Sequence, residues 1–230
     1  PWDDQGHGSH TAGTVGAVGG NGIGISGVAP RVSLMPLKFL SQDGTGSTEN
    51  AIRAINYGVA AGAQILSNSW GGDEYSQALE EAITAAAEKN VLFLAAAGND
   101  TSDNDVTPMY PASYRLPNVI SVAASDRTEQ LADFSNFGAQ SVDLVAPGDF
   151  IFSTVPGNNY SYMSGTSMAC PLVAGAAALL KAFKPSLSAQ QLKSALFRSV
   201  DRFAAYEGKV ASGGRLNVLR ALQKIGRAHV

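Results

Sequence analysis

The sequence alternates between short, unbroken apolar runs and longer segments in which apolar residues recur at helical spacing. This alternation limits the possible folds more than any other feature of the chain. The apolar runs lie at residues 63–70, 91–97, 119–123 and 142–145. The first two are closed by Gly71-Gly72 and Gly98-Asn99, and runs of this kind predict strands that are buried on both faces.

Helical spacing occurs in four segments around these runs. Ser47 is placed to cap a helix that carries Ile52, Ile55 and Val59. The other helices are predicted for residues 76–90, for residues 167–183 and after a capping box at residues 188–191. Strands that alternate with helices predict a doubly wound α/β fold, with a mostly parallel central sheet and helices on both faces. Functional sites of such folds lie at the carboxyl ends of the strands.

Composition excludes several classes of function. Charged residues make up 15% of the chain, well below the roughly 25% of an average globular domain. The net charge of −3, without any run of like charge, argues against nucleic-acid binding. The longest apolar stretch, residues 169–180, contains Pro171 and is shorter than the ~20 residues of a membrane-spanning helix.

The single cysteine, Cys170, is expected to be a small buried hydrophobe. Without repeats or low-complexity linkers, residues 1–230 are predicted to form one domain.

Two segments carry the residue types of nucleophilic catalysis. Residues 6–14 read Gly-His-Gly-Ser-His-Thr-Ala-Gly-Thr and place His7 in a glycine-rich turn, and residues 165–171 read Gly-Thr-Ser-Met-Ala-Cys-Pro. Ser167 stands at the start of a predicted helix, where backbone N–H groups favour negative charge, and a histidine is suited to take its proton. Asn99, at the end of a predicted buried strand, offers a side-chain N–H to an oxyanion.

These segments resemble the signatures of the subtilisin-like serine proteases, and they occur in that family's order with Ala96-Ala97-Gly98-Asn99 between them. Shorter matches lie at residues 69–71, 110–114, 134–136, 145–148 and 213–217. The resemblance covers the whole chain and implies a subtilisin-like three-layer fold and a serine endopeptidase activity. It makes His7 the general base, Ser167 the nucleophile and Asn99 the oxyanion donor.

The resemblance also implies where a substrate would bind. An extended peptide would add as a strand between Gly44-Thr45-Gly46 and Ser69-Trp70-Gly71, with Ala96 and Gly98 nearby. Trp70 is either a wall of the substrate pocket or an ordinary core residue, and the expected P1 side chain is apolar. The expected partners are protein or peptide substrates and a pro-segment, and neither a nucleic acid nor a membrane is expected. The protein would be a secreted, extracellular monomer.

One feature of the family has no counterpart in the chain. The family's triad aspartate lies on a strand upstream of the histidine segment, and only six residues precede His7. Asp3 and Asp4 resemble the acidic pair that commonly precedes the histidine, and they are expected to be solvated loop carboxylates. Residues 1–230 are therefore expected to be a single catalytic domain that lacks the N-terminal strand with the triad aspartate.

The glycine-rich segment at residues 19–25 resembles the calcium loop of the family. By that resemblance the Asn21 side chain and the carbonyls of Val18, Ile23 and Ile25 would bind a structural calcium ion, because calcium prefers oxygen ligands, and the remaining ligands would lie upstream of these residues. The alternative is an ordinary flexible loop. A phosphate-binding loop is disfavoured, because the segment lacks the strand-then-helix context and the acidic residue of a dinucleotide site.

Other interpretations of the catalytic candidates are weaker. An α/β-hydrolase needs its histidine after the nucleophile, and only His229 follows Ser167. A chymotrypsin-like enzyme is all-β, whereas this chain is predicted to alternate strands and helices. His7 and His10 lack the third ligand of a zinc motif, and His10 is expected to be a supporting residue. The alternative from a different class is a non-catalytic, protease-like module, although the expected base, nucleophile and oxyanion donor are all retained.

Overall fold

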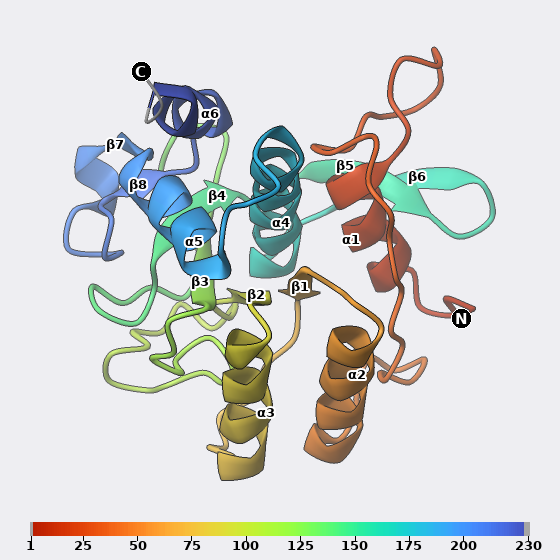
Figure 1. Cartoon of the computed structure of the whole chain (residues 1–230), viewed down its shortest axis with the longest axis horizontal. Coiled ribbons are helices and arrows are strands. Elements are labelled where there is room, and N and C mark those ends of the chain that lie inside the picture. Colours follow the sequence, from red (N-terminus) through yellow and green to blue (C-terminus); the bar gives the residue numbers. More distant parts are fainter. Residues whose placement is uncertain (1, 228–230) are drawn as a thin grey trace.

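A computed structural model describes residues 2–227 of the chain (Figure 1). The central sheet has six strands in the order β1-β2-β3-β4-β8-β7. They are β1 (Ile65–Asn68), β2 (Leu92–Ala96), β3 (Val119–Ser125), β4 (Leu144–Pro147), β7 (Asp201–Arg202) and β8 (Gly214–Arg215). Neighbouring strands are parallel from β1 to β8, and the β7–β8 pair is antiparallel. The prediction of a mostly parallel sheet is confirmed.

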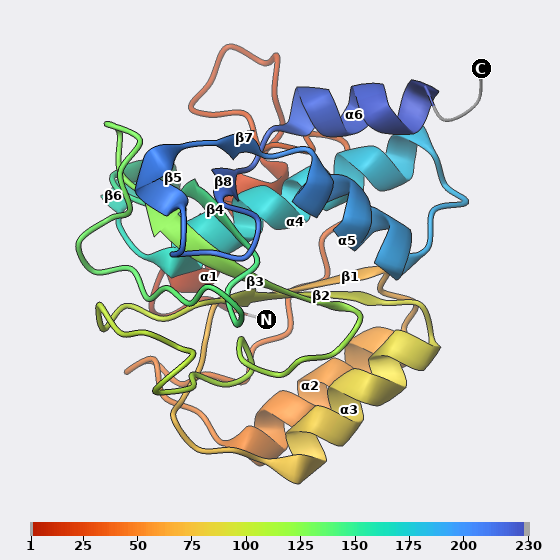
Figure 2. The same ribbon diagram turned by 90° about the vertical axis from the view of Figure 1, so that its left-hand side faces the viewer.

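Helices cover both faces of this sheet and complete a three-layer α/β fold (Figure 2). α2 (Thr48–Ala60) and α3 (Gln77–Glu88) lie on one face, and α4 (Thr166–Phe183), α5 (Ala189–Arg198) and α6 (Val218–Arg227) lie on the other. Successive residues of a strand point to opposite faces of a sheet. Phe93 of β2 therefore joins the apolar cluster that includes Ile83 of α3, whereas Leu94 joins the cluster that includes Leu180 of α4.

Three serines cap helices: Ser47 and Ser188 as the sequence predicts, and Ser76 directly before a helix that is predicted to begin with it. Their side chains accept hydrogen bonds from helix N–H groups, Ser47 from Asn50 at 3.2 Å, Ser76 from Leu79 at 3.3 Å and Ser188 from Gln191 at 3.1 Å. The Gln191 side chain also accepts the Ser188 N–H at 2.8 Å, so the predicted capping box is present. Each bond satisfies an N–H group that has no partner within its helix.

All four predicted strands differ from their predicted bounds, and β1 and β4 differ by two residues at both ends. The apolar run at residues 63–70 forms β1 only at Ile65–Asn68, because the Ala63 N–H bonds to the Gly58 carbonyl and closes the end of α2. The run at residues 142–145 leads to β4 at Leu144–Pro147, because the Val142 N–H bonds to the Gly138 carbonyl in a turn. An apolar run therefore extends beyond the residues whose backbone joins the sheet.

The structure also corrects the expected conformation around the histidine. His7 begins a helix, α1 (His7–Gly16), where the sequence analysis places a glycine-rich turn. α1 is stable despite its glycines because it packs against α4 and against β5 (Ile151–Val155), which pairs with β6 (Asn159–Met163) in a hairpin. A Cβ atom on Gly13 would lie 2.1 Å from Thr154 Oγ1, so glycine permits this close approach.

α4 is long and apolar enough to span a membrane by length and composition alone, with a mean hydropathy of 1.5. In the fold it is the central helix, which packs against α1 and against β1, β2, β3 and β4. Most of its side chains, from Thr166 to Leu180, are buried. The apolar segment is therefore longer than the stretch at residues 169–180, and it forms the middle of the protein core.

Candidate active site

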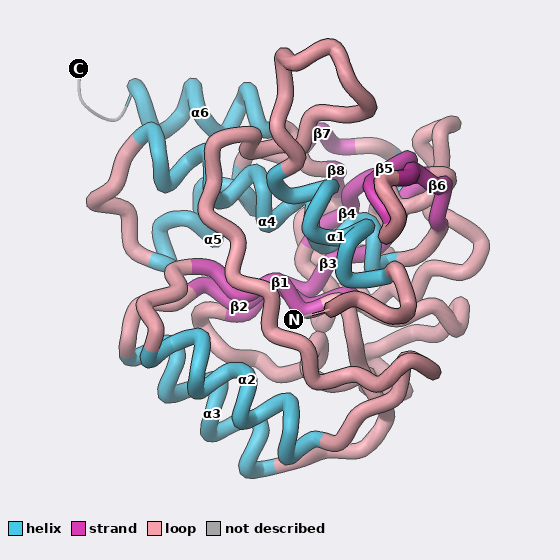
Figure 3. Tube along the Cα trace, turned by 90° about the vertical axis from the view of Figure 1, so that its right-hand side faces the viewer, coloured by secondary structure: helices cyan, strands magenta, loops and turns pink. Residues whose placement is uncertain are grey.

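The catalytic candidates lie on elements that meet at one end of the sheet. Ser69 follows β1 and Asn99 follows β2, so both stand near the carboxyl ends of adjacent parallel strands. Ser167 is the second residue of α4, which packs against both strands. α1, which begins with His7, lies against α4 and the β5–β6 hairpin (Figure 3). The fold thus gathers three distant segments of the chain on neighbouring elements.

Ser167 is half-buried and exchanges two hydrogen bonds with Ser69. The Ser167 Oγ donates to the Ser69 carbonyl at 3.3 Å, and the Ser69 Oγ donates to the Ser167 carbonyl at 2.8 Å. The second bond has a clear reason. Pro171 has no N–H and removes the bond that the Ser167 carbonyl would otherwise receive within the helix. The Ser69 hydroxyl takes its place, which ties the end of β1 to the first turn of α4.

Asn99 is exposed, but both hydrogen bonds to its carbonyl oxygen come from one buried residue. Its Oδ1 accepts the Thr166 N–H at 2.8 Å and the Thr166 hydroxyl at 3.0 Å. Because the amide oxygen is held in this way, the Nδ2 group is the part of Asn99 that remains for a ligand. Within residues 2–227, Nδ2 donates to no other group.

Two N–H groups border the same small space at the start of α4. A Cβ atom on Gly165 would lie 3.6 Å from the Ser167 backbone N, 3.7 Å from Asn99 Nδ2 and 3.6 Å from Asn99 Oδ1, which is already bonded to Thr166. Gly165 has a φ of 155°, and only the missing side chain leaves this space open. Two convergent N–H donors at a helix N-terminus are the arrangement that stabilises an oxyanion.

His7 is half-buried at the first position of α1. Burial lowers the pKa of its imidazole below the usual value of 6.5, and His10 adds to this effect, whereas Asp3 opposes it. A histidine with such a pKa is neutral at pH 7 and can accept a proton. Within the described residues, the His7 ring makes no hydrogen bond to Ser167, because the Ser167 hydroxyl is bonded to Ser69. In the same residues the His7 ring makes no hydrogen bond to a carboxylate either.

Asp3 is more than a solvated loop carboxylate, which corrects the expectation for it, whereas Asp4 is an exposed loop carboxylate as expected. Asp3 accepts the N–H groups of Gly6 at 2.8 Å and of Ser9 at 2.7 Å and thereby anchors the start of α1. Although burial raises it, these hydrogen bonds lower the pKa of Asp3 to about 2. Asp4 forms an ion pair with Lys38. Neither carboxylate is hydrogen-bonded to the His7 ring in residues 2–227, so neither takes the place of a triad aspartate.

His10 lies one turn after His7 and is fully buried. Its Nε2 donates to the Ile151 carbonyl at 2.9 Å and is 3.2 Å from the Ser161 carbonyl. Two carbonyl partners require a proton on Nε2, so the neutral ring carries no proton on Nδ1. His10 therefore ties α1 to the β5–β6 hairpin, and this geometry gives it the supporting role expected from the sequence.

The expected substrate segments lie before α2, directly after β1 and at the end of β2. Gly44-Thr45-Gly46 is an exposed turn, closed by a 2.8 Å bond from the Ser41 N–H to the Thr45 carbonyl. Ser69-Trp70-Gly71 follows β1, and Ala96 and Gly98 stand at the end of β2. Trp70 is half-buried: its Nε1 donates to Asn68 Oδ1 at 3.2 Å and its ring meets Phe39 edge-on. Trp70 thus packs against the core and still borders the surface.

Comparison with known proteins shows the family of the chain. The model of the Subtilase family matches residues 1–221. Subtilisin DY of Bacillus licheniformis is 40% identical over 224 residues, which cover 96% of this chain and 79% of that protein. Thermitase of Thermoactinomyces vulgaris is 37% identical over 223 residues, which cover 97% of this chain and 77% of that protein. The chain belongs to the subtilase family.

The share of each relative that the chain covers varies widely. Subtilisin-like protease 2 of Plasmodium falciparum is 40% identical over 184 residues, which cover 78% of this chain but 14% of that protein. The chain of this subtilase therefore corresponds to a small part of some relatives and to more than three quarters of subtilisin DY and thermitase.

The expected calcium loop of this subtilase does not by itself make a calcium site. Calcium takes six to eight oxygen ligands, and the four expected oxygens of Val18, Asn21, Ile23 and Ile25 are too few. Residues 18–25 contain no Asp or Glu, and Asn21 Oδ1 already accepts the Ile23 N–H at 3.0 Å. The part of the chain that the structure describes also holds no group of three His, Cys, Asp or Glu side chains placed for a metal. The described loop is therefore a poor fit to calcium.

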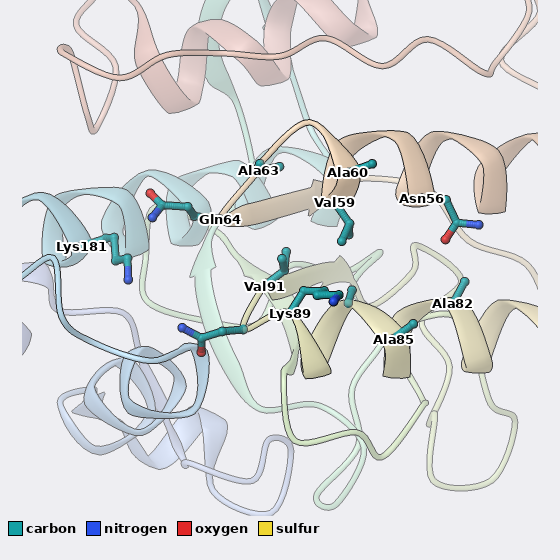
Figure 4. Close-up of a pocket in the computed structure, with 13 residues that line it drawn as sticks. Asn56, Val59, Ala60, Ala63, Gln64, Ala82, Ala85, Lys89, Val91 and Lys181 are labelled. Carbon is teal, nitrogen blue, oxygen red and sulfur yellow. The ribbon is translucent and has the colours of Figure 1, made fainter.

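A pocket of about 580 Å³ lies at the amino ends of β1 and β2 (Figure 4). It is bordered by the last turns of α2 and α3, by Gln64 and Val91 before β1 and β2, and by Lys181 of α4. The catalytic candidates do not line it. The candidate residues lie instead near the carboxyl ends of the strands, where sites of such folds are expected.

Cys170 is fully buried one turn after the nucleophile. Burial raises the pKa of its thiol to about 11, so the thiol stays protonated and unreactive at neutral pH. The structure thus agrees with its expected role as a small hydrophobe.

Sequence reasoning missed the roles of Thr166, which bonds to Asn99, and of Asn136, which bonds to the loop that carries Asn99. Both residues lie in segments that carry the family resemblance, but the pattern alone gave them no role.

Proposed function

We propose that this subtilase is a serine endopeptidase that hydrolyses peptide bonds through an acyl-enzyme on Ser167, with His7 as the general base. The observation that carries the proposal is the position of the Ser167 backbone N and Asn99 Nδ2, which lie 3.6 and 3.7 Å from a Cβ atom placed on Gly165, at the start of the helix that carries the Ser167 hydroxyl. A nucleophile beside two N–H donors is the arrangement that acyl transfer requires.

In the proposed reaction the Ser167 hydroxyl leaves the Ser69 carbonyl and donates to His7 instead. As Ser167 Oγ attacks the scissile carbonyl, its proton passes to His7, and the carbonyl oxygen becomes an oxyanion bound by Ser167 N–H and Asn99 Nδ2. The peptide C–N bond then breaks, and His7 returns the proton to the leaving amine. A water molecule then attacks the acyl-enzyme while His7 takes its proton, and His7 returns the proton to Ser167 Oγ as the second product leaves.

The proposed substrates are protein or peptide chains bound in an extended form. Gly44-Thr45-Gly46 and Ser69-Trp70-Gly71 are exposed or half-exposed backbone segments at which a substrate strand would add. The half-buried Trp70 ring supports an apolar P1 preference, because it offers apolar surface beside the end of β1. By the same family resemblance we propose a secreted monomer that is made with a pro-segment.

We further propose that the triad aspartate is carried on a strand that these 230 residues do not contain. β1 is the outer strand of the described sheet, and its outer backbone edge is open to a further strand. The connection from α1 to α2 passes this edge as a loop (Figure 3) and exposes the side chains of Leu34 and Met35. An added strand would cover apolar surface and bring a carboxylate toward α1.

Labelling with a serine-directed phosphonylating reagent tests the proposed nucleophile. We expect one adduct per active molecule, on Ser167, and no adduct in Ser167→Ala. Ser164→Ala is the matched control, because Ser164 is exposed three residues earlier, bonds to Asp149 at 2.7 Å and should leave labelling intact. An adduct on another residue, or an active preparation that takes no label, would overturn the assignment.

A further inference from the structure

The loop that carries Asn99 is held by a second segment of the chain. Residues 98–104 follow β2 and run beside residues 134–138. Four backbone hydrogen bonds join the two segments: Asn136 N–H to the Gly98 carbonyl at 3.0 Å, Thr101 N–H to Phe134 at 3.0 Å, Phe137 N–H to Ser102 at 3.0 Å and Asn104 N–H to Phe137 at 2.7 Å. The position of Asn99 thus depends on residues nearly forty positions later.

The side chain of Asn136 fills the inside of this loop. Its Oδ1 accepts the Asp100 N–H at 2.7 Å and the Ser102 N–H at 3.1 Å. Thr101, between these two donors, has a φ of 55°, which is an uncommon conformation for a residue other than glycine. One amide oxygen therefore fixes the peptide directly after Asn99 and stabilises the strained residue beyond it.

A second asparagine completes the contact. Asn136 Nδ2 donates to Asn104 Oδ1 at 3.0 Å, and Asn104 Nδ2 donates to the Ala97 carbonyl at 2.8 Å, two residues before Asn99. Asn136 is 1% and Asn104 2% exposed, so both amides are cut off from water. Buried amides are costly unless they are hydrogen-bonded, and a bonded network of this kind makes a loop rigid.

The approach between the two segments is unusually close. A Cβ atom on Gly98 would lie 2.3 Å from Asn136 Nδ2, so the amide lies directly against the backbone before Asn99. On its other side, Asn99 is held by Thr166 through its Oδ1. Asn99 is therefore held between two buried residues, with its side chain fixed by α4 and its backbone fixed by the asparagine pair.

We propose that Asn136, backed by Asn104, is a positioning residue for the oxyanion donor Asn99. The inference rests on the proposed function, because it assigns the pair an effect on the transition state. Asn136 touches no substrate atom in this scheme and acts only through the 98–104 loop. Removing its amide leaves Asp100 and Ser102 N–H without their acceptor and lets the loop relax, which moves Asn99 Nδ2 away from the developing charge.

The test compares kcat and KM of Asn136→Ala, Asn99→Leu and the double variant, in the protein extended by the upstream segment proposed above. Removal of one oxyanion donor costs about 10²–10³ in kcat, and a misplaced group can cost about 10². We expect Asn136→Ala to lower kcat by about 10- to 100-fold with KM nearly unchanged. In the Asn99→Leu background the same change should lower kcat by less than about threefold, because the group that it positions is already gone.

Asn118→Ala is the matched control. Asn118 is also an asparagine with 1% exposure and donates to two carbonyls, of Ile83 at 3.2 Å and Val91 at 3.1 Å, at the amino ends of the strands. It should lower the melting temperature but leave kcat, counted per labelled Ser167, within about twofold of wild type, because it is distant from the site. If Asn136→Ala does not fold, Asn104→Ala replaces it in the test, because this variant keeps both hydrogen bonds to Asn136 Oδ1. Asn104→Ala should lower kcat by less than Asn136→Ala, and its effect should likewise disappear in the Asn99→Leu background.

Two results would overturn the positioning role: an unchanged kcat in the folded variants, or an equal loss with and without Asn99. Failure of the proposed function would look different. In that case the wild-type protein itself would neither cleave peptides nor take a label on Ser167, whatever residue stands at position 136.

Discussion

Ser167 and Ser69 exchange hydrogen bonds in both directions, and the nucleophile is thereby held against the end of β1. The Ser167 hydroxyl donates to the Ser69 carbonyl, and the Ser69 hydroxyl donates to the Ser167 carbonyl, which Pro171 deprives of its helical donor. This pair explains how a proline is accommodated one turn after the nucleophile. It also means that the resting hydroxyl is bonded to a carbonyl and must turn to reach a base.

We expect Ser69→Ala to lower the free energy of unfolding by about 1 kcal/mol, because the Ser167 carbonyl loses its partner. For a chain of this length the melting temperature should fall by roughly 2–4 °C. The loss should be smaller in a Pro171→Ala background, where the new N–H of residue 171 can donate to the Ser167 carbonyl. Thermal unfolding of the four proteins measures this. Equal losses in both backgrounds would show that the two groups do not compete for one carbonyl.

Asn99→Leu should lower kcat by about 10²–10³ with little change in KM, because the oxyanion forms only in the transition state. This magnitude is the one measured for removal of such a donor in a subtilisin. Steady-state kinetics on a chromogenic peptide is the measurement. Asn56→Leu, at an exposed position of α2, is the control and should leave both constants unchanged. A loss below about threefold would mean that Asn99 is not the oxyanion donor.

Residues 1–230 alone should be a very poor protease, although they hold the nucleophile, the base and the oxyanion donor. Without a carboxylate on its far nitrogen, His7 has neither its tautomer fixed nor its imidazolium stabilised. Loss of the triad aspartate alone costs about 3 × 10⁴ in kcat in a subtilisin. The measurement compares the short chain with the upstream-extended protein at equal concentrations of folded protein. If their activities agree within about tenfold and Asp4→Asn abolishes the activity of the short chain, Asp4 completes the triad.

In the 230-residue chain the His7 ring should titrate below pH 6.5, since burial and His10 lower its pKa. Protonated His7 cannot accept the Ser167 proton, so any activity should be lost as the pH falls through this lowered pKa. Asp3→Asn should lower the His7 pKa further, because it removes the negative charge that favours the imidazolium. Proton NMR of the two imidazole C–H signals measures both values. Gln5→Glu is the control of opposite sign, because it adds a negative charge on an exposed side chain nearby and should raise the His7 pKa. A rise on removing Asp3 would contradict this account.

The sequence by itself predicts the elements whose stabilising contacts are local or periodic. Ser47, Ser76 and Ser188 begin helices because each cap bonds to a residue three positions later. β2 and β3 are predicted because unbroken apolar runs suit strands that are covered on both faces. The family motifs likewise name Ser167, His7 and Asn99 as candidates, since each motif is a short stretch of consecutive residues.

Only the tertiary structure decides the features that depend on distant partners. α1 is a helix because Asp3 anchors its start and because α4 and β5 bury its glycine-rich face, neither of which appears in its own pattern. The strand bounds of β1 and β4 depend on backbone bonds outside the apolar runs. Asn136 looks like one more polar residue until the fold places its amide inside the loop of Asn99. A buried hydrogen bond depends on a partner from elsewhere in the chain, and the fold alone chooses that partner.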